Sequence, residues 1–174
     1  MTIGNSSSKQ AYGEPWYWDN RYSQDPGPFD WYQKYPALSP LLDLYLLRHH
    51  RILLVGCGNS GTLDSLMCGH NAQQNATKML EEVGRILKDK GIYILITYGA
   101  PNFRLSLLRE PRLWTIKLHL IEKLGSEARS LPTWELTNPI PLDDDGSSVT
   151  STMGENPDVH YIYVCIKDGS LRMQ

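Results

Sequence analysis

The sequence predicts an α/β fold, and three features in its middle support that prediction. A short apolar run, Ile52–Val55, ends in a glycine-rich turn. A segment with apolar residues at helical spacing follows over 73–88, and a continuous apolar run, Ile92–Tyr98, comes directly after it. Strand, helix and strand in alternation are typical of α/β domains with parallel sheets. A length of 174 residues is that of one domain.

The N-terminal part of the chain is strongly aromatic. Nine of the 17 Phe, Tyr and Trp residues lie between Tyr12 and Tyr35, after a polar stretch, residues 1–11, that we expect to be disordered. The aromatic segment carries too much Pro, Gly, Asp and Asn for one long helix, and too many rings for a solvated tail. Two interpretations stay open: a flap that caps one end of a core, or a lid over a ligand.

A helix and a buried strand are expected next. Ser39 can cap the helix, Pro40 suits its first turn, and an apolar face follows. The strand Ile52–Val55 runs into a turn in which Gly56 and Gly58 let the backbone approach a ligand closely, since neither has a Cβ. Ligands in open α/β sheets bind beyond the carboxyl ends of strands, so this turn is the first candidate site.

The second half of the chain holds the remaining expected elements. Asn71 can cap the helix over 73–88, and Ile92–Tyr98 is apolar enough for a strand buried on both faces. The alternation over Val159–Lys167 predicts a strand beside a sheet edge. In chain order, the expectations after Tyr98 are a helix over 105–116, a weak strand over 118–124, a loop over 125–158, a strand over 159–167 and a tail over 169–174.

Composition and charge exclude several function classes. With 17 basic and 19 acidic residues the net charge is −2, far from the strongly basic character of nucleic-acid-binding domains, so no nucleic-acid partner is expected. No apolar stretch approaches the ~20 residues of a membrane span, and the N-terminus lacks the features of a signal peptide. Three cysteines without paired spacing suit a reducing compartment, so we expect a cytoplasmic protein. Tetrahedral ligand spacing is also missing, so no metal site is expected.

Taken literally, the glycine turn matches the dinucleotide-binding fingerprint with Gly56, Gly58 and Gly61. That fingerprint also needs an acidic residue at the end of a second strand, about 20 residues further on, to hold the ribose hydroxyls. Glu81 and Glu82 stand near that distance, but both fall inside the expected helix. The turn therefore does not predict a dehydrogenase.

Four stretches together resemble one family, the methyltransferase-like group that includes lysine methyltransferases of translation elongation factor and their plant relatives. The stretches are residues 12–22, Phe29–Tyr32, Ile52–Ser60 and Gly61–Leu66. The resemblance implies a single class I, Rossmann-like domain over residues 12–168. It also implies the cofactor S-adenosylmethionine (S-adenosyl-L-methionine) and a protein substrate such as an elongation factor.

The resemblance implies roles for individual residues as well. On the acceptor side of the site it implies Thr62 and Asp64. Aromatic faces suit the methyl donor, because a sulfonium is a cation without hydrogen-bond donors, and each face is worth roughly 0.5–2 kcal/mol. The residues implied to contact the donor are Trp18, Tyr22, Trp31, Gly56 and Gly58.

The resemblance also implies an internal deletion. In the family the glycine turn and the Gly-Thr-Leu-Asp motif lie far apart, whereas here Ser60 is followed at once by Gly61. At about 30 residues per strand–helix unit, roughly 60 or more residues of the core are absent. The expected fold is therefore a truncated Rossmann-like sheet that lacks its second to fourth strands. In it, Ile52–Val55 and Ile92–Tyr98 either pair in parallel or leave an open slot.

Two functions stay open at this point. The first is a protein-lysine methyltransferase whose donor binding and activity are impaired by the deletion. The second is a non-catalytic remnant that binds protein partners or competes with the intact enzyme. Because Ile52–Val55 loses its neighbours, we also expect an exposed edge strand there, with low stability and non-specific self-association as consequences.

Overall fold

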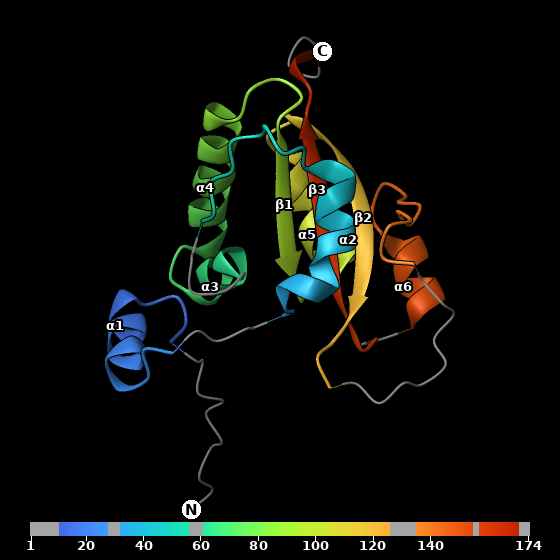
Figure 1. The fold of residues 1–174 in the computed structure, drawn as a ribbon. Coiled ribbons are helices and arrows are strands. Elements are labelled where there is room, and N and C mark those ends of the chain that lie inside the picture. The colour runs from blue at the N-terminus through green and yellow to red at the C-terminus, as the bar shows by residue number, and fades with distance from the viewer. Residues whose placement is uncertain (1–10, 28–31, 56–60, 126–134, 155–156, 171–174) are drawn as a thin grey trace, which may run out of the picture.

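A computed structural model describes residues 11–27, 32–55, 61–125, 135–154 and 157–170. These residues form a mixed α/β fold with six helices and a three-stranded antiparallel sheet (Figure 1). In chain order the elements are α1 (Pro15–Gln24), α2 (Tyr35–Tyr45), α3 (Thr62–Cys68), α4 (Ala72–Ile86), β1 (Ile92–Thr97), α5 (Pro101–Arg109), β2 (Trp114–Glu122), α6 (Ser147–Met153) and β3 (Val159–Lys167). None of the helices in the described ranges is long and apolar enough to cross a membrane.

The central strand of the sheet is β3, and both of its neighbours run antiparallel to it. Ile92 of β1 lies opposite Ile166, and Trp114 of β2 lies opposite Lys167. Every residue from Val159 to Cys165 is buried, because helices pack on both faces of this strand. The strand predicted near the C-terminus is confirmed, bounds included.

The two faces of the sheet carry different amounts of helix. One face is covered by α2, whose Leu41 packs with Ile162 and Val164. The other face holds the main core, to which α3, α4, α5 and α6 all contribute (Figure 1). Tyr163 and Leu108 are fully buried in this core. The described residues therefore pack around β3, with a cluster of buried side chains on each of its faces.

The helix predicted over 73–88 is confirmed as α4. Packing explains the glycine inside this helix, because a Cβ at Gly84 would lie only 2.3 Å from Cδ1 of Leu113. Lys167 of β3 reaches the end of this helix, and its Nζ donates hydrogen bonds to the carbonyls of Gly84 and Leu87 at 2.6 and 2.5 Å. The lysine thus satisfies carbonyl groups that a helix leaves open at its C-terminus.

Two helix predictions and one loop prediction are corrected by the structure. In α2, Pro40 lies inside the helix rather than in its first turn, because Pro36 takes that position. The helix predicted to reach residue 116 ends early as α5, and Trp114 begins β2 instead, since its side chain packs in the main core. In the region predicted as a loop, α6 forms around the buried Val149.

The expectation of a buried strand at Ile52–Val55 is wrong. These residues form no strand, and their side chains are 47–70% exposed. The predicted strand at Ile92–Tyr98 is confirmed as β1, but it pairs antiparallel with β3. In the described part of the chain, β1 is an outer strand of the sheet. Ile52–Val55 does not pair with it, so the predicted parallel pair of strands is not formed.

Candidate functional site

A buried carboxylate, that of Asp64, joins the N-terminal region to the end of β1. Asp64 lies in the first turn of α3, and its Oδ1 accepts hydrogen bonds from Thr97 Oγ1 at 2.5 Å and Arg104 Nη2 at 2.7 Å. Its Oδ2 accepts one from the Tyr32 hydroxyl and one from the backbone N–H of Tyr98 at 3.3 Å. These four donors fill the roughly four lone-pair sites of a carboxylate.

We call Asp64 and its four donors, Tyr32, Thr97, Tyr98 and Arg104, the Asp64 group. Arg104 of α5 is its positively charged member, and both side chains of the Arg104–Asp64 ion pair are buried. The Thr97 hydroxyl supports the pair, because it also accepts the N–H of Gly99 at 2.9 Å and Nε of Arg104 at 3.4 Å. The carbonyl of Gly99 in turn accepts the hydroxyl of Tyr163 at 2.9 Å. Removing one member of such a pair leaves a buried charge without compensation.

On the sheet side, His160 of β3 borders the Asp64 group through Tyr32. The two rings meet edge to face with centroids 4.6 Å apart, and Nδ1 of His160 is buried without a hydrogen-bond partner among the described residues. Burial lowers the pKa of His160, and the charge of Lys123 lowers it further. Burial and the carboxylate of Asp64 raise the pKa of Tyr32, so its hydroxyl stays protonated and donates.

The hydrogen bonds of the Asp64 group suit a structural role rather than the role of a general base. A general base must reach the proton that it abstracts, and protein donors already occupy the sites on Asp64. Thr62 lies on the same turn of α3 and is half-buried, and its hydroxyl donates to the carbonyl of Val55 at 3.4 Å. The structure therefore brings the two expected acceptor-side residues onto one short helix, with Asp64 inside the fold and Thr62 at its rim.

Two of the residues implied to contact the donor, Trp18 and Tyr22, lie together on α1. Their rings stack with centroids 6.3 Å apart, and the indole N–H of Trp18 donates to the carbonyl of Tyr12 at 2.8 Å. This helix lies beside α3 and away from the sheet (Figure 1), and it contributes no residue to either core. A close backbone approach ties it down, because a Cβ on Gly13 would lie 2.2 Å from Cα of Gly69.

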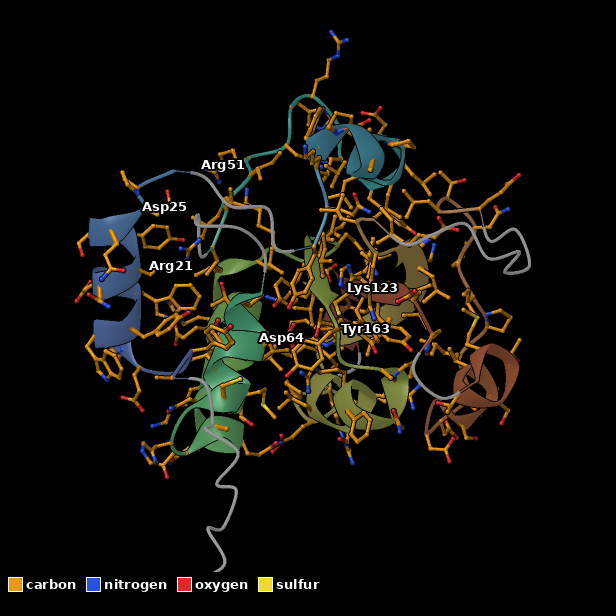
Figure 2. The ribbon with its side chains drawn as sticks, turned by 90° about the horizontal axis from the view of Figure 1, so that it is seen from below. Arg21, Asp25, Arg51, Asp64, Lys123 and Tyr163 are labelled. Atoms are coloured by element: carbon orange, nitrogen blue, oxygen red, sulfur yellow. The ribbon has the colours of Figure 1, made fainter. Side chains whose placement is uncertain are left out.

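The other three implied donor contacts, Trp31, Gly56 and Gly58, lie outside the described residues, as do residues 1–10. In Figure 2, Asp64 lies between Arg21 of α1 and Tyr163 of the sheet. Within the described ranges, no three His, Cys, Asp or Glu side chains are placed to hold a metal ion.

The partners of Asp64 are the residues that sequence reasoning missed. Thr97 ends an apolar strand, and polar groups at a strand end are a usual signal of a site in α/β proteins, so it could have been found. Arg104 stands in a helix where most arginines face water, and Tyr32 was one ring among nine in the aromatic segment. Neither carried a local signal that it would meet a carboxylate.

Comparisons with known proteins link part of the chain to one family. Over 60 residues, 33% of this chain, it is 38% identical to a mouse (Mus musculus) protein described as EEF1A lysine methyltransferase 4. Over 61 residues, 34% of this chain, it is 37% identical to the bovine (Bos taurus) protein of the same description. The match spans about a quarter of the length of these relatives, 24% in each case. No family model and no solved structure matches the chain. A third of the chain is thus similar to lysine methyltransferases.

Proposed function

We propose that the chain is a shortened protein-lysine methyltransferase that uses S-adenosylmethionine and binds it weakly. The similarity to the mouse and bovine lysine methyltransferases is the observation that supports this reaction class. When bound, S-adenosylmethionine supplies an electrophilic methyl group to a neutral lysine amine. The protein contributes mainly alignment of the two reactants and exclusion of water.

The stacked rings on α1 support the donor side of this proposal. Trp18 and Tyr22 lie one helical turn apart, so that their faces are held in a fixed relation without a contribution to the core. Aromatic faces attract a cation that has no hydrogen-bond donors, which is the chemical character of a sulfonium. We assign the donor to these two residues together with Trp31, Gly56 and Gly58.

The ribose of the donor needs a carboxylate partner, and the described residues between Gly61 and β1 do not supply one. Between Gly61 and β1 the chain builds only α3 and α4. Asp64 is fully hydrogen-bonded there, and Glu81 and Glu82 lie on the exposed side of α4. Two carboxylate–hydroxyl hydrogen bonds are worth about 1.5–3 kcal/mol each, so their loss lowers affinity about 10²–10⁴-fold.

On the acceptor side we assign Thr62 to the rim of the site and Asp64 to a positioning role. The hydrogen bonds of Asp64 hold the first turn of α3 against the end of β1 and against Arg104 of α5. Through this turn Asp64 determines where the Thr62 hydroxyl lies. A lysine side chain that enters here meets a fixed rim rather than a carboxylate with open acceptor sites.

Calorimetric titration of the full chain with S-adenosylmethionine tests the proposal. We expect a dissociation constant about 10²–10⁴-fold above that of the mouse relative, and a further loss of binding in Tyr22→Ala. Trp16→Ala is the matched control, because this ring is on the same helix and 60% exposed, outside the proposed contacts. An affinity equal to that of the mouse relative would show that another group holds the ribose. Equal effects of the two substitutions would remove α1 from the donor site.

A second function, binding of the protein substrate without catalysis, is favoured by the fully hydrogen-bonded state of Asp64. In that case the chain competes with an intact enzyme for its substrate. Added to the mouse relative, it would raise the apparent KM for EEF1A and leave kcat unchanged. Donor-dependent methyl transfer by the chain itself would contradict this second function and support the first.

A further inference from the structure

The two outer edges of the sheet differ in what covers them. At the outer edge of β2, the N–H of Ile140 donates to the carbonyl of Leu118 at 2.8 Å, and His119 Nδ1 lies 2.8 Å from the carbonyl of Leu136. Residues 136–140 therefore shield this edge. At the outer edge of β1, no strand or bridge is found among the described residues. An open edge is a place where another strand can add.

The strand register shows which backbone groups face the open edge of β1. The N–H of Lys167 donates to the carbonyl of Gly91 at 2.8 Å, and antiparallel pairing alternates from there, so the odd-numbered residues of β1 bond to β3. The even-numbered residues therefore turn their N–H and C=O groups away from β3. These residues are Ile92, Ile94 and Ile96.

One end of this edge is already closed. Tyr98 continues the even-numbered series, and its backbone N–H is taken by Oδ2 of Asp64. Over the described residues, no backbone hydrogen bond from outside the sheet reaches the three isoleucines. Their side chains are partly buried and pack toward the cluster around Leu41, so an added strand would find an apolar surface beside it.

The same chain exposes a segment that suits this edge. The side chains of Ile52, Leu53, Leu54 and Val55 are 69, 69, 70 and 47% exposed. The segment holds no Pro, Gly or charged residue, and two of its four side chains are β-branched, which favours extended backbone. One molecule therefore carries both an open strand edge and an exposed apolar segment able to pair with it.

We propose that two copies of the chain exchange these segments, so that Ile52–Val55 of each copy adds as a strand to the β1 edge of the other. In a two-fold symmetric arrangement each copy gives one segment to the other and receives one from it, so the assembly closes at a dimer, whereas a head-to-tail arrangement would continue into larger species. A second copy is the occupant because it supplies segment and edge in equal number. The dimer does not depend on donor binding or on methyl transfer.

The apolar area available is in the range that a stable dimer needs. Complete burial of one aliphatic side chain removes roughly 60–120 Å² of apolar surface from water. Four side chains that are already partly shielded bury on the order of 250 Å², and the dimer requires a similar area from the receiving edge and the residues around it. Two symmetric contacts then reach about 1,000 Å², which is where specific interfaces begin.

Sedimentation velocity of the full chain, from low micromolar to several hundred micromolar, tests the exchange. We expect a monomer–dimer equilibrium without larger species, and a dimer dissociation constant at least about tenfold higher in Leu53→Lys. Leu44→Lys is the matched control, since Leu44 is 54% exposed on α2, outside the segment, and should leave the dimer unchanged. Both positions are exposed, so at concentrations where the chain is monomeric both variants should keep the unfolding midpoint of the parent chain.

Hydrogen exchange identifies the edge that is used. The amides of Ile92, Ile94 and Ile96 should exchange more slowly as the concentration of the chain rises, while amides at the outer edge of β2 should not change. A monomer at every concentration overturns the proposal, and so does an equal effect of the two lysine substitutions. Protection of β1 that is independent of concentration also overturns it, because the segment would then pair within its own copy.

Discussion

Two apolar segments have opposite environments in this protein. Val159–Cys165 is 0–8% exposed, whereas Ile52–Val55 is 47–70% exposed. The first lies in β3, with a strand on each side and helices on both faces, and the second lies outside the sheet. The hydrophobic effect makes either segment able to be buried, but a strand is buried only where neighbours satisfy its backbone groups. An apolar run predicts a strand, but whether the strand forms depends on the segments that can pair with it.

The Asp64 group is where the two regions meet. Tyr32 comes from the N-terminal region, while Thr97 and Arg104 come from the region that builds the sheet. If the fold depends on the sheet region, substitutions in the Asp64 group and in α2 should lower the free energy of unfolding strongly. Substitutions in Ile52–Val55 should not. Three predictions test this comparison, from the largest expected effect to the smallest.

The largest effect is expected for Arg104→Ala. It leaves the buried carboxylate of Asp64 without a counter-charge, which costs about 3–5 kcal/mol of the free energy of unfolding. Urea denaturation followed by circular dichroism measures it. Arg85→Ala is the control, since its ion pair with Glu82 is exposed and worth at most about 0.5 kcal/mol. An effect of Arg104→Ala no larger than the control would show that the Asp64 group does not join the two regions.

A matched pair of leucine truncations compares the regions directly. Leu41→Ala removes a fully buried side chain from the contact between α2 and the sheet and should cost about 2–5 kcal/mol. Leu53→Ala removes an exposed one and should change the free energy of unfolding by less than about 0.5 kcal/mol at concentrations where the chain is monomeric. Equal losses in urea denaturation would mean that residues 52–55 are packed in solution.

The smallest effect concerns pH and His160. Burial and Lys123 lower its pKa in the folded state, while the nearby Tyr32 carbonyl and Asp64 oppose the shift. The unfolded chain therefore binds a proton that the folded chain does not, between the folded pKa and the ordinary value of about 6.5. Stability should be complete above that ordinary value and should fall as the pH drops through the window below it.

The urea midpoint measured across this window checks the prediction for His160. His119 is also buried with a lowered pKa and contributes in the same direction, so His160→Gln should remove only part of the pH dependence. A midpoint that rises on acidification would contradict the assignment.

Periodic segments were predictable, while elements that depend on distant contacts were not. The helical spacing of α4 and the apolar runs of β1 and β3 are visible in the sequence, and all three form. The sequence of α6 is rich in Ser and Thr and forms its helix around Val149, which packs against the core. The sequence around Trp114 predicts a helix. In the structure its side chain packs against Tyr93 and in the main core, and the residue begins a strand instead.

The candidate site divides in the same way. The sequence singled out Asp64 and Thr62 through a motif and placed Trp18 and Tyr22 on one aromatic segment, because those relations are local. The donors to Asp64 stand 32 to 40 residues away along the chain, so only the fold could bring them to one carboxylate.

By itself, then, the sequence determined the α/β character, the bounds of the C-terminal strand and the position of α4, since helix and strand periods are written in the spacing of apolar residues. The tertiary structure decided strand direction, strand order and which apolar run became part of the core. Those outcomes depend on backbone hydrogen-bond partners and on packing across the sheet, and neither is a property of any one segment. The same reason explains why Asp64 lies buried among its donors and why Ile52–Val55 remains exposed.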